Sequence, residues 1–244
     1  RTGKPAARAL LPLCGSGLLL LCGALLPLHL PENVSGERIR IAFFLIAAVV
    51  DFRARRAIAP GGWQIVSVGH WTERHRLIVL IALGETIISI GAGRGLTGGR
   101  PITWAVIITA ALGVLIVGVL WWSYIDTAGP AAQQATERQP AATRSRFARD
   151  AYSLWHLPQI LGLVLVALGL KRALSAVEPD SAYRWDVLGV LVLYGGVLLY
   201  LLGLLVLERR TIGVLGRSPL LGISLVVTLV PIARNLPPTA AVGL

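Results

Sequence analysis

The chain has 244 residues, of which 55% are hydrophobic and only 14% are charged, and its mean hydropathy is +0.72. A soluble domain usually carries about 25% charged and about 45–50% apolar residues, so this composition excludes a disordered chain and argues against a soluble domain. The net charge of +11 would suggest nucleic-acid binding in a soluble protein. In a membrane protein, such an excess is first compared with the charge bias of the loops.

The N-terminal region predicts a membrane helix. The chain begins at Arg1 and contains no Met, and we therefore expect it to be a fragment of a longer protein. The apolar run from Ala9 to Leu28 is too long for a typical signal peptide. Cys14 and Cys22 lie in this run, about 12 Å apart along a helix, which is too far for a disulfide. With no other cysteine in the chain, we expect no disulfide framework, no metal and no cofactor.

Apolar runs predict seven membrane segments, at about 20 residues for each crossing of the bilayer. The second is the weakest, because it is bounded by Arg40 and Asp51 and spans only if arginine side chains reach back to the interface. The sequence therefore predicts an all-α fold, a polytopic transmembrane helix bundle of about seven segments that forms one integral-membrane domain over residues 1–244. The segments are Leu10–Leu28, Ile39–Val50, Leu77–Gly93, Ile102–Tyr124, Leu157–Leu170, Val187–Leu207 and Leu220–Ala233.

Lys and Arg are distributed unevenly between the two sides that seven crossings define. Fifteen lie on the side of the N-terminus and eight on the other side, and cytoplasmic loops are the ones enriched in these residues. The bias places loops 53–76, 138–149 and 209–217 in the cytoplasm, whether or not the second segment spans. The stretch 127–149, rich in Ala, Gln, Thr, Pro and Arg, is predicted to be a flexible cytoplasmic loop. Because the arginines are spread over loops of both sides, we expect no binding of nucleic acid.

Glycines recur at intervals of seven residues on two segments. Gly162 and Gly169 lie on the fifth, and Gly189, Gly196 and Gly203 lie on the sixth. Strips of small residues let the backbones of two helices approach closely. We expect these glycines to form a packing seam.

Glu85 lies in the middle of the third segment, within LIVLIALGETIISIGAG. It follows Arg76 by about 13–14 Å of helix, which is near the centre of the bilayer core. A lone charge at this depth costs several kcal/mol, so Glu85 must be protonated, paired or exposed to a wet cavity. It is either a titratable proton-relay or cation-binding group or a neutral acid bonded to a neighbouring helix. We expect its face of the helix to point into the bundle, together with Ile78, Ile81, Ile88 and Ser89.

A cluster of polar residues is predicted at the cytoplasmic mouth of these helices. The stretch His70-Trp71-Thr72-Glu73-Arg74-His75 precedes the third segment. Its histidines are five residues apart rather than the four of a zinc-protease helix, so zinc catalysis is not expected. The cluster is either a ring of interfacial ion pairs or a vestibule that leads to Glu85. Its members are Asp51, His70, Glu73, Arg74, His75, Asp126 and His156.

These residues also carry a resemblance to a known family. The H-x-x-E-R-H block at 70–75, followed by Gly84 and Glu85, resembles the signature of the bacterial low temperature requirement protein A family, and WWSYID (121–126) and YSLWHLPQILGLVLVALGLKRAL (152–174) are similar to it. The similarity runs from about residue 35 to the end. It implies a multi-pass, all-helical protein of the bacterial inner membrane with longer full-length relatives. Arg76 departs from the family, which usually has a small residue there, and the family's cold-growth name supplies no substrate.

Three functions are weighed from the sequence. The first is proton- or ion-coupled transport of a small ion or molecule, with Glu85 as the titrating group and the polar cluster as its mouth. The second is a membrane-embedded enzyme for lipid or isoprenoid substrates at the cytoplasmic face; it is less favoured because no nucleophile motif or phosphate loop is visible, and no catalytic residue is assigned. The third is a structural or sensory bundle. The lipid bilayer is the expected partner in all three.

Overall fold

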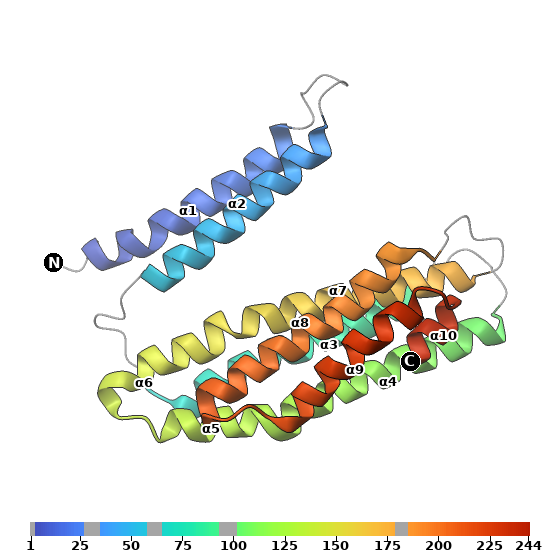
Figure 1. Ribbon diagram of the computed structural model, residues 1–244. Coiled ribbons are helices and arrows are strands. Elements are labelled where there is room, and N and C mark those ends of the chain that lie inside the picture. The colour runs from blue at the N-terminus through green and yellow to red at the C-terminus, as the bar shows by residue number, and fades with distance from the viewer. Residues whose placement is uncertain (1–2, 27–34, 58–64, 93–101, 179–184) are drawn as a thin grey trace. The chain divides into compact units, whose positions relative to one another are not determined.

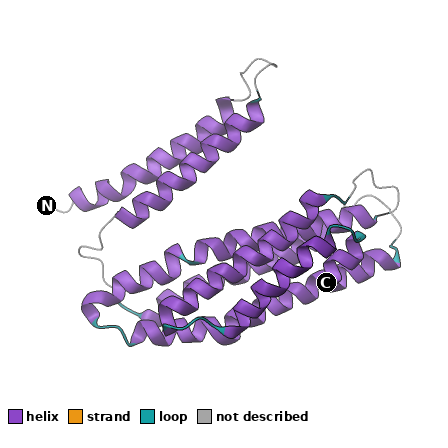
Figure 2. Cartoon of the chain, viewed as in Figure 1, coloured by secondary structure: helices purple, strands orange, loops and turns teal. Residues whose placement is uncertain are grey.

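The computed structural model describes residues 3–26, 35–57, 65–92, 102–178 and 185–244. These residues are helical almost throughout, and no strand occurs among them (Figure 2), which confirms the all-α prediction. The chain divides into two compact units, residues 1–63 and 64–244, and each is described by itself. That the two units act as a single membrane domain stays a prediction.

The first unit is a helical hairpin of α1 (Gly3–Leu25) and α2 (Gly36–Ala57). The two helices approach closely at Gly23, where a Cβ would lie 2.7 Å from the Cβ of Phe43. The helix α2 extends beyond the predicted second segment, Ile39–Val50, at both ends. It continues through Asp51, whose side chain is half-buried.

The second unit is a bundle whose long helices lie side by side (Figure 1). The described residues of the five remaining predicted segments lie almost entirely in helices of this unit. Three continuous helical stretches, 104–137, 141–177 and 187–212, are long and apolar enough to cross a membrane within the described part of the chain, whereas a total of seven crossings stays a prediction. The principal helices are α3 (Val68–Ala92), α4 (Trp104–Trp122), α7 (His156–Val177), α8 (Val187–Ile212), α9 (Arg217–Ala233) and α10 (Pro238–Gly243).

The stretch 127–149, expected as a flexible loop, is instead a helical hairpin. It continues α4 and leads into α7 through the π-helical turns η2 (Ser123–Ala128) and η3 (Arg149–Leu154) and the helices α5 (Gly129–Glu137) and α6 (Ala141–Ala148). Ala, Gln, Glu and Arg are good helix formers, and Pro130 directly follows the π-helical turn η2, where the regular α-helical hydrogen bonding is already interrupted. Ala132 and Ala148 are fully buried, so packing against the bundle stabilises this hairpin.

Glycines form the contact between α7 and α8. A Cβ on Gly162 would lie 2.6 Å from the backbone nitrogen of Tyr200, and one on Gly196 would lie 2.7 Å from the backbone nitrogen of Val166. Gly189 instead faces the indole ring that precedes its own helix. The predicted seam is therefore confirmed at Gly162, Gly169, Gly196 and Gly203.

Candidate functional site

Two π-helical turns place aromatic side chains in the interior of the second unit. A π-helical turn inserts an extra residue into a helix and frequently marks a functional site. Tyr124 lies on η2 and Tyr152 lies on η3, and both side chains are only 1% exposed. His156, the first residue of α7, follows η3 directly and is also buried. The turns at the two ends of the α5–α6 hairpin therefore bring three polar aromatic side chains together.

A hydrogen bond joins Tyr124 and His156. The Tyr124 hydroxyl lies 2.5 Å from Nε2 of His156, and Nδ1 of the same ring lies 3.5 Å from the carbonyl oxygen of Ala151. Because a carbonyl oxygen only accepts, Nδ1 carries the hydrogen in the tautomer that fits both contacts. In the neutral ring Nε2 is then the acceptor, and the Tyr124 hydroxyl donates to it.

Three further rings surround this pair. Tyr152 stacks on His156 with ring centroids 5.3 Å apart, and His75 approaches His156 edge-on at 5.7 Å. Trp71 lies one turn before His75 on α3, and their ring centroids are 4.7 Å apart. We name this group the aromatic cluster: Trp71, His75, Tyr124, Tyr152 and His156.

The two histidines are the side chains of the cluster whose rings have a nitrogen that can accept a proton. Nδ1 of His75 donates to the carbonyl oxygen of Trp71 at 2.9 Å, so Nε2 is the nitrogen at which His75 can gain or lose a proton. The half-buried Arg76 acts electrostatically on the hydroxyls of Tyr124 and Tyr152. The ring centroids of His75 and His156 are 5.7 Å apart, so two imidazolium charges at these positions would repel each other. We therefore expect the pair to bind one added proton rather than two.

Hydroxyl groups satisfy the backbone where the π-helical turn η2 begins. The carbonyl oxygen of Leu120 accepts hydrogen bonds of 2.7 Å from both Ser123 and Tyr200. A carbonyl that is buried without such donors would cost free energy, so these side chains stabilise the interrupted helix. Through Tyr200, α8 is tied to the segment that carries Tyr124.

Gln159 extends the polar groups of α7 beyond His156. It lies three residues later, and therefore on the same side of the helix. Its side chain is fully buried, and neither amide atom has a hydrogen-bond partner among the described residues. Such a group is rare and needs an explanation. Because its amide offers both a donor and an acceptor, Gln159 is a candidate for the next hydrogen-bonding group after His156 along α7.

Glu85 does not point into the second unit. Its side chain is exposed, and so are Ile81 at 71% and Ile88 at 63%, so the inward orientation predicted for this face is not found within the second unit. The buried stripe of α3 instead follows the spacing of three, four and seven residues and packs against α4 and α7. Its members are Thr72, Val79, Leu83, Thr86 and Ile90.

Of the seven residues predicted for the cytoplasmic mouth, the structure brings only His75 and His156 together. Asp51 belongs to the first unit. The remaining residues, which have exposed side chains, are His70, Glu73, Arg74 and Asp126.

The tyrosines of the cluster were not among the predicted site residues. Both lie in the two stretches with family resemblance, WWSYID and YSLWH, and this was the available signal. No group of three or more His, Cys, Asp or Glu side chains that could hold a metal ion occurs within the described ranges.

Comparisons with known proteins give one family and one relative of note. The model of the family described as bacterial low temperature requirement A protein matches residues 2–244. Uncharacterized protein RA0937 of Rhizobium meliloti (strain 1021) is 28% identical over 226 residues, which cover 86% of this chain and 52% of that protein. The chain thus spans about half the length of this relative. No solved structure matches the chain.

Proposed function

The chain belongs to the bacterial low temperature requirement A family, and because this description names no substrate, we propose a function from the geometry of the structure. We propose that the aromatic cluster binds and relays a proton, and that the protein couples this proton to the movement of a small ion or molecule across the membrane. The chain is a membrane protein by its family and by its long apolar helices. The proposal transfers to His75 and His156 the role that the sequence suggested for Glu85.

The observation that carries the proposal is the hydrogen bond between Tyr124 and His156 in the interior of the bundle. In the neutral ring, Nε2 accepts from the Tyr124 hydroxyl. A proton added at Nε2 turns this nitrogen into a donor, so the Tyr124 hydroxyl must rotate and offer its hydrogen to another acceptor. One proton therefore reverses the direction of the hydrogen bond, and this reversal is the elementary step of a relay.

The path into the cluster follows from the fold. His75 lies in the second turn of α3, next to His156, and Gln159 lies one turn further along α7. A proton that enters at Nε2 of His75 is passed to the Tyr124–His156 pair, and the unpaired amide of Gln159 offers the next hydrogen-bonding group. Polar and titratable side chains within a membrane bundle typically mark such a path.

We propose that the end of the bundle nearest His75 faces the cytoplasm of a bacterial inner membrane. The loop before α3 meets the hairpin there, where the backbone nitrogen of Ile65 donates to Ser145 at 3.2 Å. The start of α9 lies at the same end, since Thr127 and Arg217 line one groove. The Lys and Arg bias assigns loops 53–76, 138–149 and 209–217 to the cytoplasm, and their described residues within the second unit lie at this one end. Reporter fusions at residues 139 and 214 would both report the cytoplasm.

The test compares two histidines on the same helix. Purified protein is reconstituted in liposomes that contain a pH-sensitive dye, and proton entry is driven by a potassium diffusion potential. Wild-type protein is expected to carry protons above the level of empty liposomes, and His75→Gln is expected to lower this flux at least about tenfold. His70→Gln is the matched control, because His70 is exposed five residues earlier on α3. Equal flux in the two variants, or wild-type flux equal to that of empty liposomes, contradicts the proposal.

A further inference from the structure

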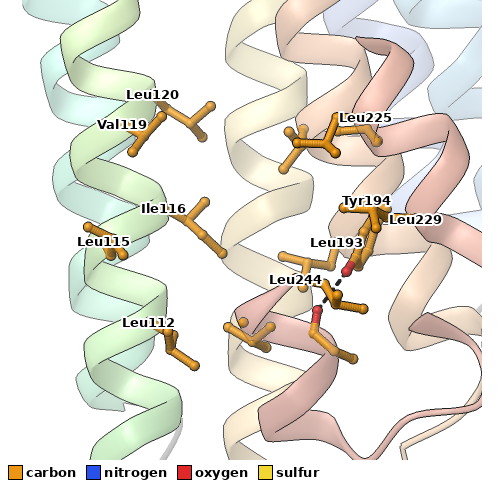
Figure 3. Close-up of a pocket in the computed structure, with 15 residues that line it drawn as sticks. Leu112, Leu115, Ile116, Val119, Leu120, Leu193, Tyr194, Leu225, Leu229 and Leu244 are labelled. Atoms are coloured by element: carbon orange, nitrogen blue, oxygen red, sulfur yellow. Dashed lines mark hydrogen bonds between the residues drawn. The ribbon is translucent and has the colours of Figure 1, made fainter. Parts of the chain in front are cut away.

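The second unit carries an apolar groove lined by residues outside the aromatic cluster. It has a volume of about 280 Å³ and lies between α4 on one side and α8, α9 and α10 on the other. Figure 3 shows Ile116 and Leu120 of α4 across the groove from Leu193 of α8 and Leu225 of α9. Every lining side chain is apolar except Tyr194.

The one hydroxyl in this groove is already used by the protein. Tyr194 donates to the carbonyl oxygen of Ala241 at 2.7 Å (Figure 3), and Thr109 and Thr239 form a second link between α4 and α10 at 2.8 Å. These two bonds hold α10 as the floor of the groove. A ligand here meets hydrocarbon, and the fitting occupant is itself hydrocarbon.

A second groove adjoins the first and is polar at its far end. It has a volume of about 780 Å³ and shares Leu115 and Val119 of α4 with the apolar groove. From this shared wall, its lining passes to charged and hydroxyl side chains near the start of α9: Ser123, Thr127, Glu208, Arg217 and Ser218. The two grooves together form one amphipathic channel along α4, apolar toward α10 and polar toward the α8–α9 turn.

The polar end carries one cation and one anion. Arg217 is exposed, while the Glu208 carboxylate interacts with the backbone N–H of Gly216 and its buried Oε2 has no further hydrogen-bond partner among the described residues. Gly216 permits this, because a Cβ at that position would collide with the Glu208 carboxylate. One backbone N–H does not balance the negative charge of a partly buried carboxylate, and an ammonium group would do so. An occupant with a phosphate for Arg217 and an ammonium for Glu208 therefore matches both charges.

From this gradient we infer that the channel along α4 binds one phospholipid whose head group carries a phosphate and a primary ammonium group. An acyl chain lies in the apolar groove between Leu112 and Leu120, and the head group lies between Arg217 and Glu208. The site is separate from the aromatic cluster and takes a ligand of another class from the proposed transport substrate.

The binding of an acyl chain is tested by placing a large side chain at Val119, on the wall that the two grooves share. The full chain is purified in detergent, phosphatidylethanolamine is added, and bound lipid is counted by native mass spectrometry. Val119→Trp is expected to lower occupancy about tenfold, because the indole blocks the wall that both grooves share. Val114→Trp is the matched control, since Val114 is a similarly exposed valine of α4 that lines neither groove. Equal occupancy in both variants overturns the inference and indicates lipid bound only as an unspecific shell.

The head-group assignment is tested by comparing three phospholipids and by substituting the two charged residues, Glu208 and Arg217. Phosphatidylethanolamine is expected to outcompete phosphatidylglycerol and phosphatidylcholine, because only the first has both a phosphate and a primary ammonium. Glu208→Gln is expected to remove this preference for phosphatidylethanolamine, and Arg217→Gln is expected to weaken lipid binding roughly tenfold. Arg210 is an exposed arginine outside the groove, so Arg210→Gln is the control and is expected to leave lipid binding unchanged. Equal binding of the three lipids overturns the head-group assignment.

A photo-crosslinker at position 119 identifies the occupant in the intact membrane. An adduct with the mass of a phospholipid supports the inference. An adduct with a second copy of the chain or with another protein overturns it, because the channel is then a protein interface.

Discussion

The inner and outer faces of α3 differ in a way that changes where the function is sought. The inner face carries His75 and the buried stripe that includes Leu83 and Thr86, and it packs on α4 and α7. The outer face carries Glu85 among exposed isoleucines. An acidic residue in the middle of an apolar helix is a candidate functional residue in a sequence, but it contributes to a buried site only if its face of the helix packs against other helices. In the second unit, the covered face is the one with the histidine.

The largest expected effect is a difference in the free energy of unfolding between substitutions on the inner face and on the outer face of α3. Leu83→Ala is expected to destabilise the protein by about 2–5 kcal/mol, because it removes a buried side chain and leaves a cavity. Ile81→Ala, two residues earlier on the exposed face, is expected to cost less than about 1 kcal/mol. The measurement is thermal unfolding in detergent, followed by tryptophan fluorescence. Equal losses would show that both faces are covered in solution.

A second inner–outer pair lies on α8. Gly196→Ala is expected to destabilise by about 1–3 kcal/mol, because the added Cβ meets the backbone of α7 at Val166. At Gly195 a Cβ meets no atom of the described residues within 4 Å, so Gly195→Ala is expected to be neutral or to stabilise by up to about 1 kcal/mol through helix propensity. The same unfolding measurement checks both variants, and a shared sign of the two shifts contradicts the seam.

The next smaller effect concerns the cluster itself. Tyr124→Phe removes the donor to His156 and leaves its buried Nε2 without that partner, which is expected to cost about 1–2 kcal/mol. The same variant is expected to lower proton flux in liposomes, because the hydroxyl that reverses its hydrogen bond is gone. Unchanged flux together with lowered stability would assign the hydrogen bond to folding alone.

The smallest effect is expected at Glu85. Because the side chain is exposed, Glu85→Gln should change the free energy of unfolding by less than about 0.5 kcal/mol and leave proton flux at the wild-type level. Loss of flux in this variant, with His75→Gln unaffected, would return the titrating role to Glu85 and reverse the comparison of the two faces.

The sequence by itself determined the elements of the fold. Long apolar runs predict helices because only a helix satisfies its backbone within a membrane, and each of the seven runs has nearly all of its described residues in a helix. The close approach of α7 and α8 also followed from the sequence, since the repeat of Gly162 and Gly169 with Gly196 and Gly203 leaves no side chains to separate the backbones. These features depend on composition and spacing along one helix.

Only the tertiary structure decided which faces are buried and which residues meet. Lipid is as apolar as the bundle interior, so a membrane helix is apolar all round and its hydropathy does not mark the inner face. For this reason, the sequence predicted that the face of α3 with Glu85 points into the bundle, and it did not reveal the buried stripe of the same helix. Tyr124 and Tyr152 reach His156 because π-helical turns at either end of the α5–α6 hairpin rotate them inward. Such rotations arise from packing between helices that are distant in sequence, and no local pattern encodes them.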